Sequence, residues 1–64
     1  MRISIDRELL EKAVSAFGAE HVAINWLLET HSLLGTSPAE FAKTQTGRIE
    51  VEKILSAIQF GGIV

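Results

Sequence analysis

Apolar residues in this chain recur at spacings of three and four within several stretches. Glycine or proline residues separate these stretches. The first such stretch has apolar residues at positions 9, 10, 13, 14 and 17, which places them on one face of a helix. Asp6 is suited to the N-cap and Gly18 to the C-terminal cap, so we predict a first helix over residues 6–17. We also expect Glu8 and Lys12 to pair on the opposite face of this helix.

A second helix is predicted to begin at Ala19 or Glu20 and to fray near Thr30. Its apolar side comprises Val22, Ala23, Trp26, Leu27 and Leu28, and its polar side comprises His21, Asn25 and Glu29. Trp26 has two interpretations. Large aromatic residues usually belong to the core of a small domain, but Trp is also enriched among the residues that anchor binding partners.

Residues 31–36 are predicted to form a connection from which Leu33 and Leu34 turn inward to the core. The segment Ser37-Pro38-Ala39-Glu40 then gives the clearest helix start in the sequence. It has Ser at the N-cap, Pro at the first helical position and Glu at the third, which allows reciprocal capping of backbone amides. We predict a short helix that turns Phe41 and Ala42 inward and ends near Lys43 or Thr44.

Residues 45–47 are predicted to form a turn, and a last helix should follow over 48–60. Its apolar stripe comprises Val51, Ile54, Leu55 and Ile58, continued by the region of Phe60. Glu50 and Lys53 should pair on its outer face. Gly61 is the expected left-handed cap, and 61–64 would form a flexible apolar tail. Residues 1–5 could form an extended arm or one short strand.

These elements predict an all-α fold, a small compact bundle of about four helices in one domain over residues 1–64. A chain of 64 residues buries a small core, and without cysteine it has no disulfide to stabilise it. The net charge of −2 argues against direct nucleic-acid binding. No apolar run is long enough to span a membrane and no signal peptide is visible, which favours a cytoplasmic protein.

The sequence offers little chemistry, and we predict neither catalytic residues, nor a metal site, nor a cofactor. His21 and His31 could in principle join Glu20 or Glu29 in a metal or acid–base site, but two exposed polar residues are the more common outcome. The serines lack a nucleophile motif, and the glycines lie between helices rather than in a phosphate-binding loop. The chain is therefore not expected to be an enzyme.

The order of motifs from Ala23 to Phe60 resembles the C-terminal toxin-binding domain of the Xre/MbcA/ParS antitoxins, the bacterial partners of RES-type toxins. Three groups of residues carry the resemblance. They are Ala23, Trp26 and Leu27; Leu34, Gly35 and Pro38; and Gly47, Val51, Leu55, Ile58 and Gly61. The loop has one glycine, Gly35, where many members have two. The N-terminal DNA-binding part of the family is not expected in this chain, because too few residues precede the match.

The resemblance implies a protein-binding function. RES-type toxins degrade NAD, and the antitoxin's C-terminal region packs over the toxin and obstructs its active-site cleft. Carried over, the partner-binding residues would be Ile58, Phe60, Gly61, Gly62, Ile63 and Val64. The alternatives are a stand-alone adaptor or oligomerisation module, or a phage- or plasmid-encoded inhibitor of another host protein. The first helix could also pair two copies of the chain as a homodimer.

Overall fold

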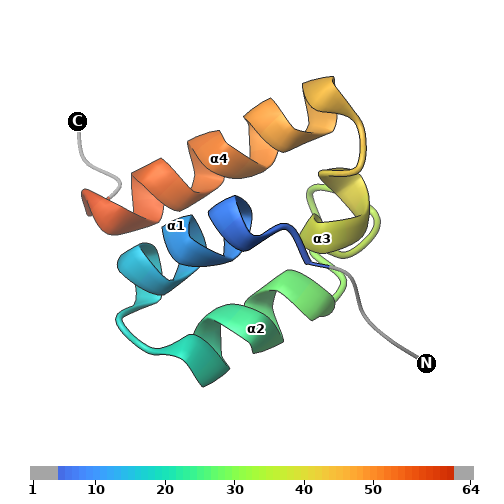
Figure 1. The fold of residues 1–64 in the computed structure, drawn as a ribbon. Helices are drawn as coiled ribbons and strands as arrows, with labels where there is room; N and C mark the ends of the chain where they lie inside the picture. The colour runs from blue at the N-terminus through green and yellow to red at the C-terminus, as the bar shows by residue number, and fades with distance from the viewer. Residues whose placement is uncertain (1–4, 62–64) are drawn as a thin grey trace.

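The computed structural model describes residues 5–61, which form four helices joined by short connections (Figure 1). The helices are α1 (Arg7–Phe17), α2 (Glu20–Leu28), α3 (Pro38–Phe41) and α4 (Gln45–Gln59). Helix α1 packs against both α2 and α4, while α3 joins α2 to the beginning of α4. The predicted all-α fold is confirmed. The predictions for residues 1–4 and 62–64 lie outside the described residues.

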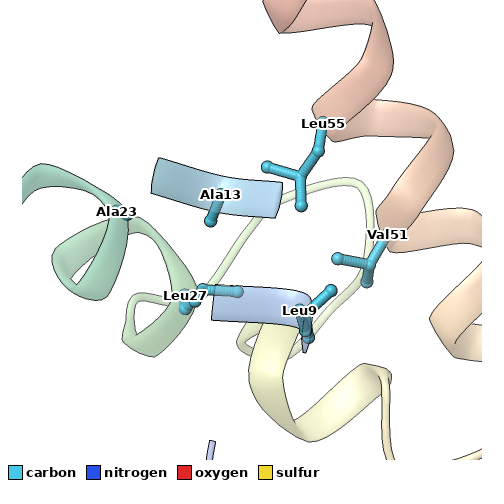
Figure 2. Close-up of a cluster of buried hydrophobic side chains, with 6 residues drawn as sticks. All are labelled: Leu9, Ala13, Ala23, Leu27, Val51 and Leu55. Atoms are coloured by element: carbon cyan, nitrogen blue, oxygen red, sulfur yellow. The ribbon is translucent and has the colours of Figure 1, made fainter. Parts of the chain in front are cut away.

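The buried core consists of one pair of residues from each of the three longer helices (Figure 2). Each pair is separated by four residues, so it lies on one side of its helix. The pairs are Leu9 and Ala13 from α1, Ala23 and Leu27 from α2, and Val51 and Leu55 from α4. Two of the six side chains are alanine, whose small size lets helices approach closely. A core this small leaves the domain dependent on its helix caps and surface contacts.

Helix α1 is capped at both ends by the residues that the sequence predicts. The Leu9 backbone N–H donates to Asp6 Oδ2 at 3.0 Å. At the other end Gly18 adopts the left-handed conformation with φ 82°, and its N–H donates to the Val14 carbonyl oxygen. A left-handed residue is easiest for glycine, which has no Cβ. Both caps are therefore confirmed.

Helix α2 buries a narrower stripe than its sequence indicates. Ala23 and Leu27 are buried, but Val22 and Leu28, which were expected on the same apolar side, are exposed. The described helices that contact α2 are α1 and α3. A single ridge of α2 side chains is enough to fill those contacts, so the flanking apolar residues remain in solvent.

The loop after α2 closes on itself, and this corrects the prediction for Leu33. The His31 N–H donates to the Thr36 carbonyl oxygen at 3.0 Å, and the His31 carbonyl oxygen accepts from Leu34 and Gly35. Within so tight a turn two adjacent leucines cannot point the same way. Leu34 packs against the core as predicted, whereas Leu33 is 82% exposed.

The connection between α3 and α4 spans residues 42–44, earlier than predicted, and the predicted turn at 45–47 is wrong. Helix α3 ends at Phe41, and Thr44 is the N-cap of α4, its hydroxyl accepting from the Gly47 N–H at 3.0 Å. Gly47 therefore lies in the first turn of α4. The Ser37 cap is confirmed, because its hydroxyl accepts from the Glu40 N–H at 3.3 Å. The Glu40 carboxylate, however, pairs with Lys43 at 2.9 Å.

Position 47 requires glycine because there is no room for a β-carbon, and not because of its backbone conformation. A β-carbon at this position would overlap the Phe41 carbonyl oxygen and lie 2.9 Å from both the Phe41 carbonyl carbon and Thr44 Oγ1. The end of α3 thus passes directly against the first turn of α4. Gly47, Val51 and Leu55 are buried at successive spacings of four, which makes one continuous seam along α4.

Candidate protein-binding surface

The C-terminal end of α4 presents apolar side chains to solvent. The buried seam of α4 would continue from Leu55 to Gln59, but this residue is polar and exposed. The neighbouring apolar residues Ile58 and Phe60 are 38% and 73% exposed. Burying them against another protein would remove apolar surface from water, which is favourable by roughly 25 cal/mol per Å². We call Ile58, Phe60 and Gly61 the α4 end.

The backbone at the α4 end leaves the helix through a left-handed glycine. The Phe60 N–H donates to the Ser56 carbonyl oxygen at 3.0 Å, and the Gly61 N–H donates to the Ile58 carbonyl oxygen at 3.2 Å. Gly61 has φ 81°, so the predicted left-handed conformation is confirmed. The chain changes direction here without steric cost.

The predicted partner-binding residues therefore divide into two groups. Ile58, Phe60 and Gly61 are brought together at the α4 end, where all three are exposed. Gly62, Ile63 and Val64 lie outside the described residues. Partner binding by any of these six residues stays a prediction.

Ion pairs of Arg48 stabilise the opposite end of α4. Arg48, whose side chain is 28% exposed, pairs with Glu52 at 2.9 Å, with Glu8 at 3.0 Å and with Asp6 at 3.1 Å. Its hydrogen bond to Glu52, with the nearby charges of Asp6 and Glu8, raises the pKa of Arg48 above its ordinary value. The guanidinium thus stays charged at any working pH, and it ties the start of α1 to the start of α4.

This network corrects one predicted ion pair. Glu8 was expected to pair with Lys12 within α1, but it contacts Arg48, forty residues further along the chain. The other predicted pair is confirmed, since Lys53 and Glu50 are 3.6 Å apart on the outer face of α4.

Trp26 is half-buried and packs between two rings. The Phe17 ring lies 5.5 Å from it between centroids, and the His31 ring lies 5.8 Å from it in an edge-on arrangement. His31 Nδ1 also accepts from the Leu33 N–H at 3.2 Å. Trp26 therefore serves as a packing residue that holds the loop against α2, with part of its surface still accessible.

Neither histidine belongs to a metal-binding group in the described part of the chain. His21 is exposed on α2, and His31 is engaged with Trp26 and the loop. Within residues 5–61, no three His, Asp or Glu side chains come together in a way that could hold a metal ion. The helices of this segment are also too short and too polar for any of them to cross a bilayer.

Leu33 is the most exposed of the apolar residues whose burial the sequence predicts. The signal was present in the adjacent leucines, because a closed six-residue loop can turn only one of them inward. Leu33 extends from a loop that is fixed by hydrogen bonds at both ends, so it is a useful reference for the α4 end.

An exposed apolar helix end on a small helical bundle is typical of a surface that contacts another protein. The family model of the antitoxin Xre/MbcA/ParS C-terminal toxin-binding domain matches residues 12–61. The match covers most of the chain and includes α2, α3 and α4, so the chain belongs to this family. Searches of curated proteins and of solved structures found no match.

Family membership defines the general function. The chain is an antitoxin domain that binds a protein toxin. Domains of this family generally act by binding and not by catalysis.

Proposed function

We propose that this chain neutralises a RES-like, NAD-degrading toxin by covering the active-site cleft of that enzyme. The α4 end, together with Gly62, Ile63 and Val64, is the segment proposed to reach the cleft. The observation that carries the proposal is the exposure of Phe60 at the end of a helix within a toxin-binding domain.

Three features of the α4 end support a contact role. Its apolar side chains extend past the last buried residue of the helix, so they contribute little to the core. Gly61 ends the helix in the left-handed conformation, which glycine adopts without steric cost. Phe is a large apolar side chain whose burial at an interface can dominate the binding energy.

The first test identifies the partner. A tagged copy of the chain is used in a pull-down from the source cell, and the bound protein is identified by mass spectrometry. Recovery of a RES-type toxin supports the proposal, whereas recovery of an unrelated host protein overturns it and favours an adaptor or an inhibitor of another target.

The second test measures NAD consumption by that toxin as the chain is titrated in. Phe60→Ala and deletion of residues 61–64 should each raise the concentration needed for inhibition, by about tenfold or more for Phe60→Ala. Leu33→Ala is the matched control, because Leu33 is similarly exposed but lies on the loop before α3. Equal inhibition by all four proteins would remove the α4 end from the mechanism.

A further inference from the structure

A groove of about 490 Å³ runs along the outer face of α1 and ends at the first turn of α2. Arg7 and Glu20 lie at its ends, and two apolar and two polar residues lie between them. We call it the α1 groove; it is lined by Arg7, Leu10, Glu11, Val14, Ser15 and Glu20.

The α1 groove is separate from the surfaces already described. Helix α1 packs its buried residues against α2 and α4, while Leu10 and Val14 touch the core only in part and remain half-buried. The toxin-binding family match begins at residue 12, so Arg7, Leu10 and Glu11 lie outside it. The other three lining residues lie inside the match, so the groove extends across its N-terminal boundary.

The order of charges in the groove is self-complementary. Arg7 lies at the start of α1, and Glu20 lies beyond the end of that helix, with Leu10 and Val14 between them. Among the residues that the structure describes, neither Arg7 nor Glu20 forms an ion pair. A positive end and a negative end on one face fit a second copy of the same face turned end for end.

We propose that the α1 groove binds a second copy of this chain, with the two α1 helices antiparallel across a two-fold axis. Helix α1 is about 16 Å long, so antiparallel alignment brings Arg7 of each copy to Glu20 of the other. Leu10 of each copy then packs on Val14 of the other. The same alignment brings each Glu11 carboxylate to the Ser15 hydroxyl of the second copy, which can donate a hydrogen bond to it.

Charge reversal tests this arrangement directly, because two-fold symmetry doubles every effect. Arg7→Glu and Glu20→Arg should each replace two attractions by two repulsions and weaken the dimer on the order of tenfold or more. The double variant Arg7→Glu with Glu20→Arg restores both attractions with reversed sign, so it should recover a dimer close in affinity to the original. Lys53→Glu on the outer face of α4 is the control and should leave the dimer unchanged.

The measurement is sedimentation equilibrium of the full chain over a range of concentrations, with circular dichroism to verify that each variant is helical. The expected result is a species of twice the 7.0 kDa chain mass that the single reversals dissociate and the double reversal restores. A chain that stays monomeric at millimolar concentration would overturn the proposal, as would a dimer that is indifferent to all three variants. The outcome does not depend on the identity of the toxin, so this proposal and the proposed function can fail separately.

Discussion

The two ends of α4 differ in what their side chains do. At the first turn Thr44 caps the helix, Gly47 lies against the end of α3, and Arg48 contacts three carboxylates. At the last turn Ile58 and Phe60 are exposed and the chain departs through a left-handed glycine. The first end contributes to the stability of the bundle, while the second adds apolar surface that the bundle does not use.

This difference shows how a small domain can combine folding with binding on one helix. Apolar surface at the helix end costs the fold little, since the core is already complete at Leu55. The tightly held first turn fixes the direction of α4, so the apolar end is presented in a defined position. Variants at the two ends should therefore separate stability from binding.

Gly47→Ala should have the largest effect on stability. Alanine normally stabilises a helix relative to glycine, but here its β-carbon would collide with the Phe41 backbone. The expected cost is about 3 kcal/mol in the free energy of unfolding, measured by urea denaturation.

Gly18→Ala is the matched control for this prediction. Gly18 has a left-handed backbone but nothing within 4 Å of a β-carbon, so its replacement should cost only about 1 kcal/mol. Equal costs at Gly18 and Gly47 would mean that the close approach of α3 is unimportant.

Trp26→Ala should be the next most damaging change. It removes the ring that packs between Phe17 and His31, and the expected cost is about 2 kcal/mol because the side chain is only half-buried. Thermal unfolding followed by circular dichroism measures this cost. A negligible change in stability with a loss of toxin binding would assign Trp26 to the interface instead.

Arg48→Ala should lower the unfolding temperature by less than Trp26→Ala, because the ion pairs of Arg48 are partly exposed to solvent. Salt screens such pairs, so the difference from the unchanged protein should shrink in 1 M NaCl. Arg48→Lys should recover only part of the loss, since lysine cannot reproduce the hydrogen-bond geometry of the guanidinium. A difference that does not depend on salt would point to packing by the side-chain stem.

Phe60→Ala should have the smallest effect on stability, below about 0.5 kcal/mol, because its side chain is 73% exposed. Urea denaturation measures this quantity under the same conditions as for Gly47→Ala. A cost of several kcal/mol would show that Phe60 belongs to the fold after all.

Much of the fold could be predicted because its signals are local. The Asp6 cap, the Ser37 cap and the left-handed glycines at 18 and 61 all act within a few residues of their position in the sequence. Side-chain capping and glycine conformation depend on neighbouring backbone, so the sequence pattern is enough to locate them.

Several predictions differ from the structure where contacts between helices decide the outcome. The sequence predicts Gly47 as a turn glycine, but its role depends on the approach of Phe41 from α3. The partner of Glu8 proved to be Arg48, which periodicity within α1 could not indicate. At the candidate site, the pattern placed Ile58 in the apolar stripe, and only the position of the neighbouring helices shows that its side chain is partly exposed.

In our account the first turn of α4 stabilises the bundle, whereas its last turn binds the toxin. The most direct test is a paired measurement on Phe60→Ala and Gly47→Ala. Toxin affinity is measured by calorimetry and corrected for the folded fraction, and the free energy of unfolding is measured on the same preparations. The account predicts that Phe60→Ala weakens toxin binding by about tenfold or more with unchanged stability, and that Gly47→Ala lowers stability with unchanged corrected affinity. Full toxin affinity in Phe60→Ala would contradict it.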